Sequence, residues 1–145
     1  MNNFIFENSS KVYFGEGCVK EYLSNILSAY GDTVMLCYGG GSIKKNGIYD
    51  EVITVLKKEN KAVVEFSGIP SNPTYSKVLE GIKLAKESNV DLILAVGGGS
   101  VMDCCKAISL GAKYDGDIWA DFWARPGVID FEPLPLGIIV TVSGT

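Results

Sequence analysis

The sequence predicts an α/β fold, in which a parallel β-sheet carries helices on both faces. Short apolar segments alternate with longer segments whose apolar residues recur at helical spacing. The short segments are apolar throughout and contain many β-branched residues, which is typical of strands buried on both faces. Because helices join these strands, neighbouring strands are expected to run parallel. The length of 145 residues suits one domain with its own core.

Two short strands are expected before the first helix. Phe4–Phe6 and Val12–Phe14 are apolar and flank the polar turn Asn8-Ser9-Ser10, the pattern of an edge hairpin or an interaction arm. Apolar residues at helical spacing then predict a first helix over Cys18–Tyr30, which Gly31 ends.

The remaining strands and helices alternate. Strands are predicted over residues 33–38, 62–66, 92–96 and 136–142. Helices are predicted from Ile48 to about Asn60 after an interruption at Asn46-Gly47, from Asn72 as N-cap and Pro73 as first residue to about Ser88, and from the turn at Gly97 to about Lys113. Residues 115–123 predict a short helix with exposed aromatic side chains, and the proline-rich residues 124–135 predict a loop.

A glycine turn stands between the third of these strands and its helix. Gly97, Gly98 and Gly99 are followed by Ser100, which can cap the helix or donate its hydroxyl. A helix N-terminus presents unpaired N–H groups and a positive dipole end, so a phosphate can bind there where no Cβ stands in its way. A tight turn without a ligand is the alternative. Met102 stands where a G-x-G-x-x-G motif needs glycine, and a P-loop lysine is absent.

Four loops of small residues fall on one edge of the predicted sheet. A second GGGS occupies Gly39–Ser42, Asn72 lies in the turn after the next strand, and Ser143-Gly144-Thr145 follows the last one. All four follow strands, and ligands of open parallel sheets bind beyond the carboxyl ends of the strands. We therefore expect a ligand site at this edge.

Composition excludes several classes of function. The net charge of −4 and the pI of about 4.8, with scattered basic residues, argue against nucleic-acid binding. No stretch is long and apolar enough for a membrane span, and Met1–Lys11 lacks a signal-peptide pattern, so a cytoplasmic location is expected. The four cysteines, without C-x-x-C spacing, are interpreted as reduced core residues. The absence of histidine removes the commonest general base and metal ligand.

Several motifs together resemble one enzyme family. The segment Gly97–Lys106 reads GGGSVMDCCK and fits the pattern GGGSxxDxxK, and it occurs with YGGGSIKKNGIYDEV, the turn Pro70–Pro73 and a final TVSGT. The combination closely resembles the N-terminal domain of the iron-dependent alcohol dehydrogenases, above all the butanol dehydrogenase branch, over essentially the whole chain. The resemblance implies a Rossmann-like, dehydroquinate synthase-like domain over residues 1–145 that binds a nicotinamide dinucleotide.

The resemblance also implies an activity and a metal outside this chain. Members reduce aldehydes such as butanal to primary alcohols with NAD(P)H, and a helical C-terminal domain holds Fe²⁺, or another divalent metal, through one Asp and three His. Those ligands are expected beyond Thr145, so we expect no catalytic or metal-binding residue here and no activity from the chain alone.

The resemblance assigns roles to particular residues. Gly97–Ser100 matches the pyrophosphate loop, and Asp103 matches an acid near the nicotinamide end, although a carboxylate that only stabilises the helix dipole is an equal alternative. Lys106 is interpreted as a solvated or structural lysine. Thr141 and Thr145 match threonines on the adenosine side, although Thr141 is equally explained as a strand residue. The expected cofactor-binding residues are Gly39, Gly40, Gly41, Ser42, Asn72, Gly97, Gly98, Gly99, Ser100, Asp103, Thr141 and Thr145.

The first GGGS bears on the choice between NADP(H) and NAD(H). In relatives that prefer NAD, an acid follows this strand and repels a 2′-phosphate, whereas this chain has Gly39. Without a carboxylate, the loop can hold a 2′-phosphate through backbone N–H groups and Ser42, with help from Lys44 or Lys45. On this ground the sequence favours NADP(H).

The sequence is also compatible with two other functions, and it suggests one oligomeric state. A stand-alone nucleotide- or phosphate-binding module explains the glycine turns without catalysis, and a zinc-dependent relative such as a glycerol dehydrogenase or dehydroquinate synthase shares part of the motif. The apolar start of the chain, with Phe4, Phe6 and Tyr13, suggests a homodimer formed through edge pairing, and packing within the domain's own sheet is the alternative.

Overall fold

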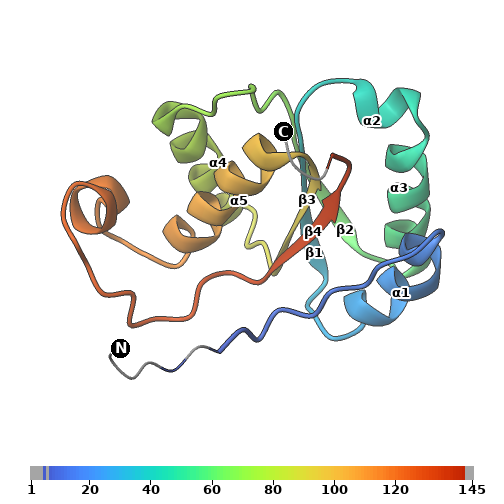
Figure 1. Cartoon of the computed structure of the whole chain (residues 1–145), viewed down its shortest axis with the longest axis horizontal. Helices are drawn as coiled ribbons and strands as arrows, with labels where there is room; N and C mark the ends of the chain where they lie inside the picture. The colour runs from blue at the N-terminus through green and yellow to red at the C-terminus, as the bar shows by residue number, and fades with distance from the viewer. Residues whose placement is uncertain (1–4, 6, 143–145) are drawn as a thin grey trace.

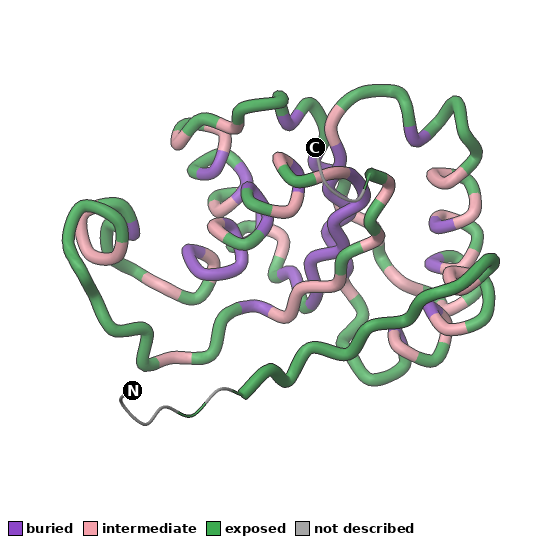
Figure 2. The backbone as a smooth tube through the Cα atoms, viewed as in Figure 1, coloured by how far each residue is buried: buried purple, intermediate pink, exposed green. Residues whose placement is uncertain are grey.

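The central sheet has four parallel strands. In the computed structural model, which describes residue 5 and residues 7–142, they are β1 (Thr33–Tyr38), β2 (Ala62–Phe66), β3 (Leu92–Gly97) and β4 (Leu136–Val140). Their spatial order is β2-β1-β3-β4, so β1 and β3 are the inner strands. Every residue of β3 and all but the first of β1 are buried, as Figure 2 shows by colour. The predicted α/β fold with a parallel sheet is confirmed.

Helices cover both faces of this sheet, as Figure 1 shows. Helices α1 (Cys18–Leu27), α2 (Ser42–Lys45) and α3 (Ile48–Lys58) lie on one face, where Leu36 of β1 packs in one core with Leu27 and Leu56. Helices α4 (Tyr75–Glu87) and α5 (Gly99–Gly111) lie on the other face. Alternate residues of the inner strands therefore enter two separate cores.

The second core contains three cysteine side chains. Cys37 of β1 and Cys104 and Cys105 of α5 are free thiols with at most 1% of their surface exposed. Contact with Cys105 and burial raise the pKa of Cys37 well above its usual range, and burial raises the pKa of Cys104 to about 11. Thiols with such pKa values are unreactive near neutral pH. The burial of these three side chains confirms their interpretation as core residues, whereas Cys18 is only half-buried.

Several elements are shorter than predicted. Helices α3 and α5 each end two residues earlier, and strand β4 ends at Val140 instead of residue 142. The first helix ends at Leu27 instead of Tyr30, and the N–H groups of Ala29 and Tyr30 close tighter turns onto Ile26 and Leu27. Helix α4 is capped by Thr74 instead of Asn72, because Thr74 has extended backbone and its Oγ1 accepts from the N–H of Lys77 at 3.3 Å. Asn72 therefore lies in the preceding loop.

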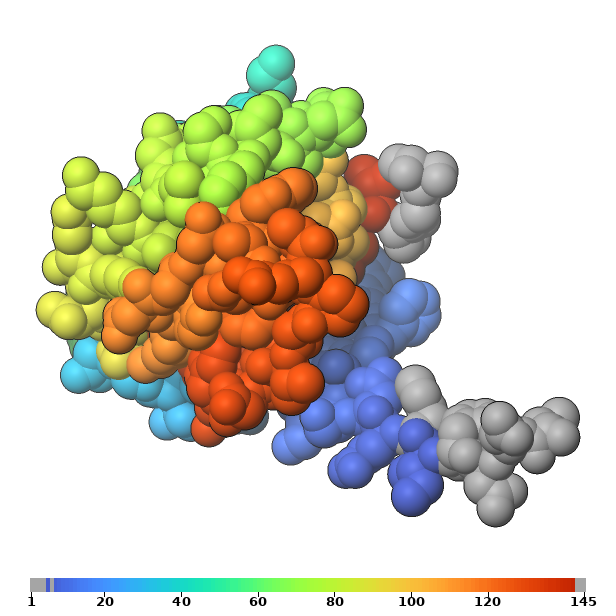
Figure 3. Space-filling view, turned by 90° about the vertical axis from the view of Figure 1, so that its left-hand side faces the viewer, coloured from blue at the N-terminus to red at the C-terminus, as the bar shows by residue number. Residues whose placement is uncertain are grey.

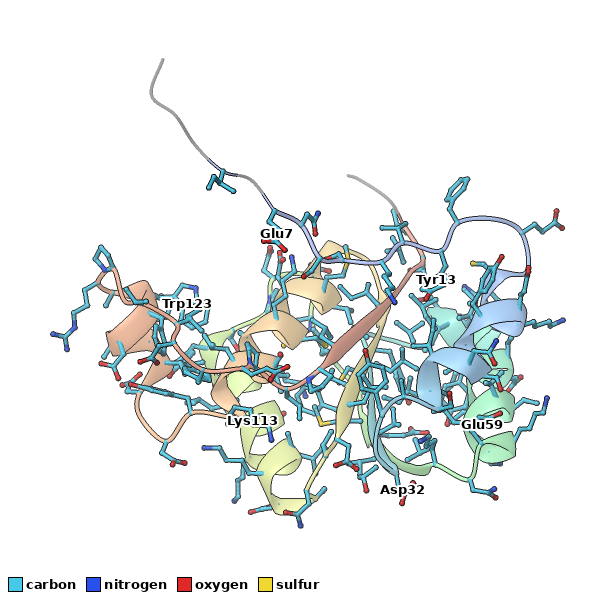
Figure 4. All side chains as sticks on the ribbon, turned by 90° about the horizontal axis from the view of Figure 1, so that it is seen from below. Glu7, Tyr13, Asp32, Glu59, Lys113 and Trp123 are labelled. Atoms are coloured by element: carbon cyan, nitrogen blue, oxygen red, sulfur yellow. The ribbon has the colours of Figure 1, made fainter. Side chains whose placement is uncertain are left out.

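The predicted N-terminal strand pair is wrong where the structure describes it. Val12–Phe14 forms no strand, and the segment from Glu7 runs without regular structure to α1; Phe4 and Phe6 lie outside the described residues. Tyr13 contacts the ring of Tyr22 in α1 at a centroid distance of 5.0 Å, and Figure 4 shows it over that helix. The apolar pattern here marks exposed side chains instead of a strand.

A short helix with exposed aromatic residues follows α5, as predicted. Trp119–Trp123 forms a π-helical turn, and its two tryptophans are 52% and 49% exposed. Asp117 fixes the start of the turn, because its Oδ1 accepts from the N–H groups of Trp119 and Ala120 and from the hydroxyl of Tyr75. Figure 3 shows this orange segment spread over the outer face of the molecule beside α4.

None of the helices in the described part of the chain has both the length and the apolar character needed to cross a membrane.

Candidate dinucleotide-binding edge

The chain changes direction across the sheet between β1 and β3. After β1 it passes through α2 and α3 on one face to reach β2, and after β3 it passes through α5 on the other face to reach β4. The loops that leave the two inner strands therefore diverge, and a crevice between such loops is where open α/β sheets bind ligands. These loops are the two glycine turns, Gly39–Ser42 and Gly97–Ser100.

The packing of the chain explains one glycine of the second turn. Gly97 is the last residue of β3 and is buried, and a Cβ on it would lie 2.7 Å from Cγ2 of Val101. Its carbonyl accepts from the N–H of Thr141 at 3.0 Å, which fixes the end of β4 beside the turn. Gly97 is therefore required by the fold itself.

The packing does not explain the next two glycines. Among the residues that the structure describes, a Cβ on Gly98 would meet nothing closer than Val142 at 3.9 Å, and one on Gly99 would meet nothing within 4 Å. Neither residue has a positive φ, and Gly98 is the N-cap with Gly99 as the first residue of α5. Open space thus lies in front of the free N–H groups of an α5 that is 13 residues long. An anionic group such as a pyrophosphate fits this space, and a side chain would fill it.

Ser100 joins this turn to the loop after β2. Its hydroxyl donates to the carbonyl of Ser71, and it makes no cap of α5. The exposed Asn72 follows Ser71 directly, so the structure brings the predicted residues Ser100 and Asn72 to the same corner of the edge. Of the two roles expected for Ser100, a helix cap or a hydroxyl donor, the structure shows the donor, because Gly98 occupies the N-cap position.

The first glycine turn is fixed at its start and open in its middle. The carbonyl of Gly39 accepts from the N–H of Gly68 at 2.8 Å, and a Cβ on Gly39 would lie 3.1 Å from the carbonyl oxygen of Ile69. Gly40 and Gly41 are exposed, with none of the described residues within 4 Å of a Cβ, and Ser42 begins α2. The two turns adjoin each other, since Val101 lies beside both Gly39 and Gly97.

Sequence reasoning missed a cluster beside the first turn, which we call the Glu65 cluster. The hydroxyl of Tyr38 donates to Oε2 of Glu65 at 2.8 Å, and the hydroxyl of Tyr49 donates to Oε1. The Nζ of Lys44 lies 4.7 Å from the ring centroid of Tyr49 and 5.6 Å from that of Tyr38. These four side chains come from β1, α2, α3 and β2, so no local spacing reveals them.

The cluster shifts the pKa values of its members. The hydrogen bond to Glu65 is the largest cause that raises the pKa of Tyr49 to about 12. Hydrogen bonds from Tyr49 and then Tyr38, with attraction by Lys44, lower the pKa of Glu65 against the opposing effect of partial burial. The carboxylate of Glu65 is thus held ionised between two phenols.

We expect one of the seven tyrosines to titrate near pH 12 and to do so because of Glu65. In Glu65→Gln, this last phenol should titrate closer to the ordinary value of 10.0. Because the folded-state pKa of Tyr49 is raised, its contribution to stability is complete below pH 10 and is lost as the pH rises towards 12. The ultraviolet absorbance of phenolate, followed against pH, measures this. An unchanged titration curve in the variant would contradict the assignment.

Asp103 and Lys106 lie on the outer side of α5. Their charged atoms are 3.6 Å apart, and both side chains are more than 60% exposed. Asp103 lines two grooves, one of about 520 Å³ shared with Lys106 and Trp123 and one of about 170 Å³ shared with Thr74 and Trp119. The described glycines of the two turns do not line either groove. The exposed side chain of Lys106 and its pairing with Asp103 fit the interpretation of a solvated or structural lysine.

The remaining predicted residues are at or beyond the end of β4. Thr141 follows β4 directly and is half-buried beside Gly97 through the hydrogen bond already described. Thr145, with the rest of the SGT end, lies outside the described residues. Across residue 5 and residues 7–142, no three histidine, cysteine, aspartate or glutamate side chains cluster in a way that could hold a metal ion.

Comparisons with known proteins identify the family. A family model described as iron-containing alcohol dehydrogenase matches residues 9–145. The chain is 47% identical over 145 residues to the probable NADH-dependent butanol dehydrogenase 2 of Bacillus subtilis and 36% identical over 148 residues to the NADPH-dependent aldehyde reductase YqhD of Escherichia coli. It superposes on the crystal structure of the NADH-dependent butanol dehydrogenase A of Thermotoga maritima with a TM-score of 0.88 and 42% identity.

The matches cover all of this chain but only part of the relatives. The chain spans 36% of the B. subtilis protein, 37% of the E. coli protein and 36% of the T. maritima chain. Within that part, the similarity includes both glycine turns and the sheet that carries them. The chain therefore belongs to the iron-containing alcohol dehydrogenase family.

Proposed function

We propose that this chain is the dinucleotide-binding domain of an alcohol dehydrogenase that reduces aldehydes such as butanal to primary alcohols with a nicotinamide cofactor. The observation that carries the proposal is the open space at Gly98 and Gly99, in front of the N-terminus of α5. Neither the packing of the described residues nor the backbone conformation requires glycine at these positions, so a ligand that approaches the backbone closely explains them. The names of the relatives supply the substrate class.

Each part of the edge has one task in this proposal. The free N–H groups of α5 bind the pyrophosphate and lie on the side of the positive helix dipole. The turn Gly39–Ser42 contacts the adenosine ribose, and Asn72 and Thr141 flank the same cofactor. When bound, the nicotinamide supplies the hydride that the reaction transfers. The chain thus contributes binding and orientation.

The metal site is proposed to lie outside this chain. Divalent metal ions in such enzymes need several convergent ligands, and the chain has no histidine. The relatives are nearly three times as long as the part that the chain matches, which leaves room for a helical metal-binding domain. That domain would supply the Fe²⁺, or another divalent metal, that polarises the carbonyl oxygen.

The cofactor is proposed to be NADP(H) or NAD(H). The residue at position 39 and the names of the relatives point to different choices between the two. Gly39 leaves the ribose loop without an acid, which favours NADP(H). The relative with 47% identity is named NADH-dependent, and the one with 36% identity is named NADPH-dependent. The dissociation constants of NADH and NADPH, measured side by side on this chain, decide between them.

We expect the chain to bind both reduced cofactors and to convert no butanal. Binding requires only the edge described above, whereas turnover requires the proposed metal domain. Titration of the chain with NADH and NADPH tests binding, and the loss of cofactor absorbance in the presence of butanal tests turnover. A version extended by the segment that the relatives carry should convert butanal and lose activity when a chelator removes the metal.

Three outcomes discriminate between the candidate functions. Turnover by the chain alone would contradict the placement of the catalytic groups elsewhere. Binding without turnover in the extended version would favour the stand-alone nucleotide-binding module. Failure of the chain to bind either dinucleotide would contradict the proposal as a whole.

A homodimer formed through the N-terminal segment and a cytoplasmic location complete the proposal. Ile5, Val12 and Phe14 are 97%, 84% and 98% exposed, so this segment offers apolar surface to a second copy. The four unpaired thiols fit a reducing compartment. Sedimentation of the extended protein with and without residues 1–14 tests the dimer.

A further inference from the structure

The carboxylate of Glu65 is connected to residues on both sides of the first glycine turn through two tyrosines. Tyr38 directly precedes Gly39, and its hydroxyl donates to Glu65. Lys44 follows Ser42 by two residues, and its ammonium lies over the rings of the same tyrosine and of Tyr49, whose hydroxyl also donates to Glu65. The Glu65 cluster therefore closes around the segment from Tyr38 to Lys44.

The cluster also fixes where the charge of Lys44 is placed. The ammonium faces two electron-rich ring faces, which are polarised further because both hydroxyls donate to a carboxylate. Glu65 is of opposite charge and attracts Lys44, as its lowered pKa reflects. The cation beside the turn is thus balanced by a carboxylate on the neighbouring strand β2.

The two nicotinamide cofactors respond differently to such a charge pair. NAD(H) carries an uncharged 2′-hydroxyl on its adenosine ribose, and NADP(H) carries a 2′-phosphate with nearly two negative charges. A free lysine beside the ribose loop favours the phosphate, and a carboxylate disfavours it through repulsion. In this chain Lys44 lies over the rings of Tyr38 and Tyr49, and the carboxylate of Glu65 is ionised.

We propose that Glu65 is a specificity-determining positioning residue, which disfavours NADP(H) by holding Lys44 on the tyrosine rings and by adding negative charge beside the ribose loop. The inference rests on the proposed function, in which Gly39–Ser42 contacts the adenosine ribose. Glu65 then supplies the negative charge that relatives that prefer NAD carry at the position of Gly39. The preference for NADP(H) suggested by Gly39 alone is therefore reversed in favour of NAD(H).

The test compares dissociation constants for NADPH and NADH in four forms of the chain: unaltered, Glu65→Gln, Lys44→Gln and the double variant. Glu65→Gln keeps the size of the side chain and removes its charge. We expect it to tighten NADPH binding at least about threefold relative to NADH, the effect of one exposed charge pair. The double variant should lose part of this gain, because the released Lys44 supplies that part and the removal of the negative charge of Glu65 supplies the rest.

Glu59→Gln is the matched control. Glu59 is the C-cap of α3 and accepts a hydrogen bond from Ser24 of α1, and Figure 4 labels it beside these helices. The control removes the same charge without touching Lys44, so the ratio should stay unchanged. Glu65→Thr, which suits an edge strand, should repeat the shift if the glutamine variant folds poorly.

Each outcome is decisive. An unchanged NADPH-to-NADH ratio in Glu65→Gln and Glu65→Thr, with both cofactors still bound, overturns the role of Glu65 and leaves the proposed function intact. A gain that is as large in the double variant as in Glu65→Gln overturns the part played by Lys44. If the unaltered chain binds neither cofactor, the proposed function and this inference both fail.

Discussion

In Gly99→Val, the chain should fold normally and bind NADH and NADPH about ten- to hundredfold more weakly, the loss expected for displaced hydrogen bonds to a charged group. Gly99 is exposed and has no positive φ, and none of the described residues lies within 4 Å of a Cβ built on it, so the fold should accept a side chain here. The side chain instead occupies the space in front of α5. Fluorescence titration measures the affinity, and urea unfolding measures the stability.

Gly99→Ala is the graded control for this variant. Alanine fills less of the space, so its effect on affinity should be smaller, and the free energy of unfolding should change by no more than about 1 kcal/mol because alanine suits a helix better than glycine. Equal affinity of the valine variant and the unaltered chain would show that no ligand approaches this backbone. Gly97→Val, by contrast, should destabilise the chain, since Val101 already occupies the space of its Cβ.

Gly81→Ala should destabilise the chain by about 1 kcal/mol, and should become stabilising when Ile108 is also changed to alanine. A Cβ on Gly81 of α4 would lie 2.3 Å from Cδ1 and 2.9 Å from Cγ1 of Ile108, which is fully buried in α5. Ile108→Ala alone should cost about 2–5 kcal/mol through the cavity it leaves. When Gly81→Ala is added to Ile108→Ala, the methyl group introduced at position 81 fills part of that cavity, and the higher helix propensity of alanine remains as a gain.

Leu56→Ala provides the matched background for this experiment. Leu56 is also fully buried, but it belongs to the core on the opposite face of the sheet. Gly81→Ala should therefore remain destabilising in the Leu56→Ala chain, because Ile108 is still in place. The free energies of unfolding from urea titrations give the coupling. A Gly81→Ala effect that is equal in all three backgrounds would contradict the close contact between α4 and α5.

The sequence allowed the sheet to be predicted because its signal is local. The strands of residues 33–38 and 62–66 were predicted at their observed bounds, since continuous apolar runs between turn residues leave little choice. The prediction of a strand over Val12–Phe14 was wrong because a local apolar pattern does not show whether a neighbouring strand is present. A short apolar run predicts a strand only if a neighbour supplies hydrogen bonds, and the sheet of this chain ends at β2 and β4.

The site was predicted only as far as its residues are contiguous. The two glycine turns could be recognised because each follows a strand, and the parallel sheet then brings them side by side. The Glu65 cluster could not, because the register Leu36↔Glu65 that brings it beside the first turn appears only in the folded sheet. The engagement of Ser100 with Ser71 likewise depends on how two distant loops meet.

The ties at the second glycine turn affect how fast a ligand can bind. The N–H of Thr141 donates to the carbonyl of Gly97, and the hydroxyl of Ser100 donates to the carbonyl of Ser71. The side chain of Val101 packs against Gly97. Three glycines in a row would otherwise sample many conformations, and a ligand would have to wait for the correct one. Because folding already selects that conformation, association should proceed in one kinetic phase whose rate rises linearly with ligand concentration.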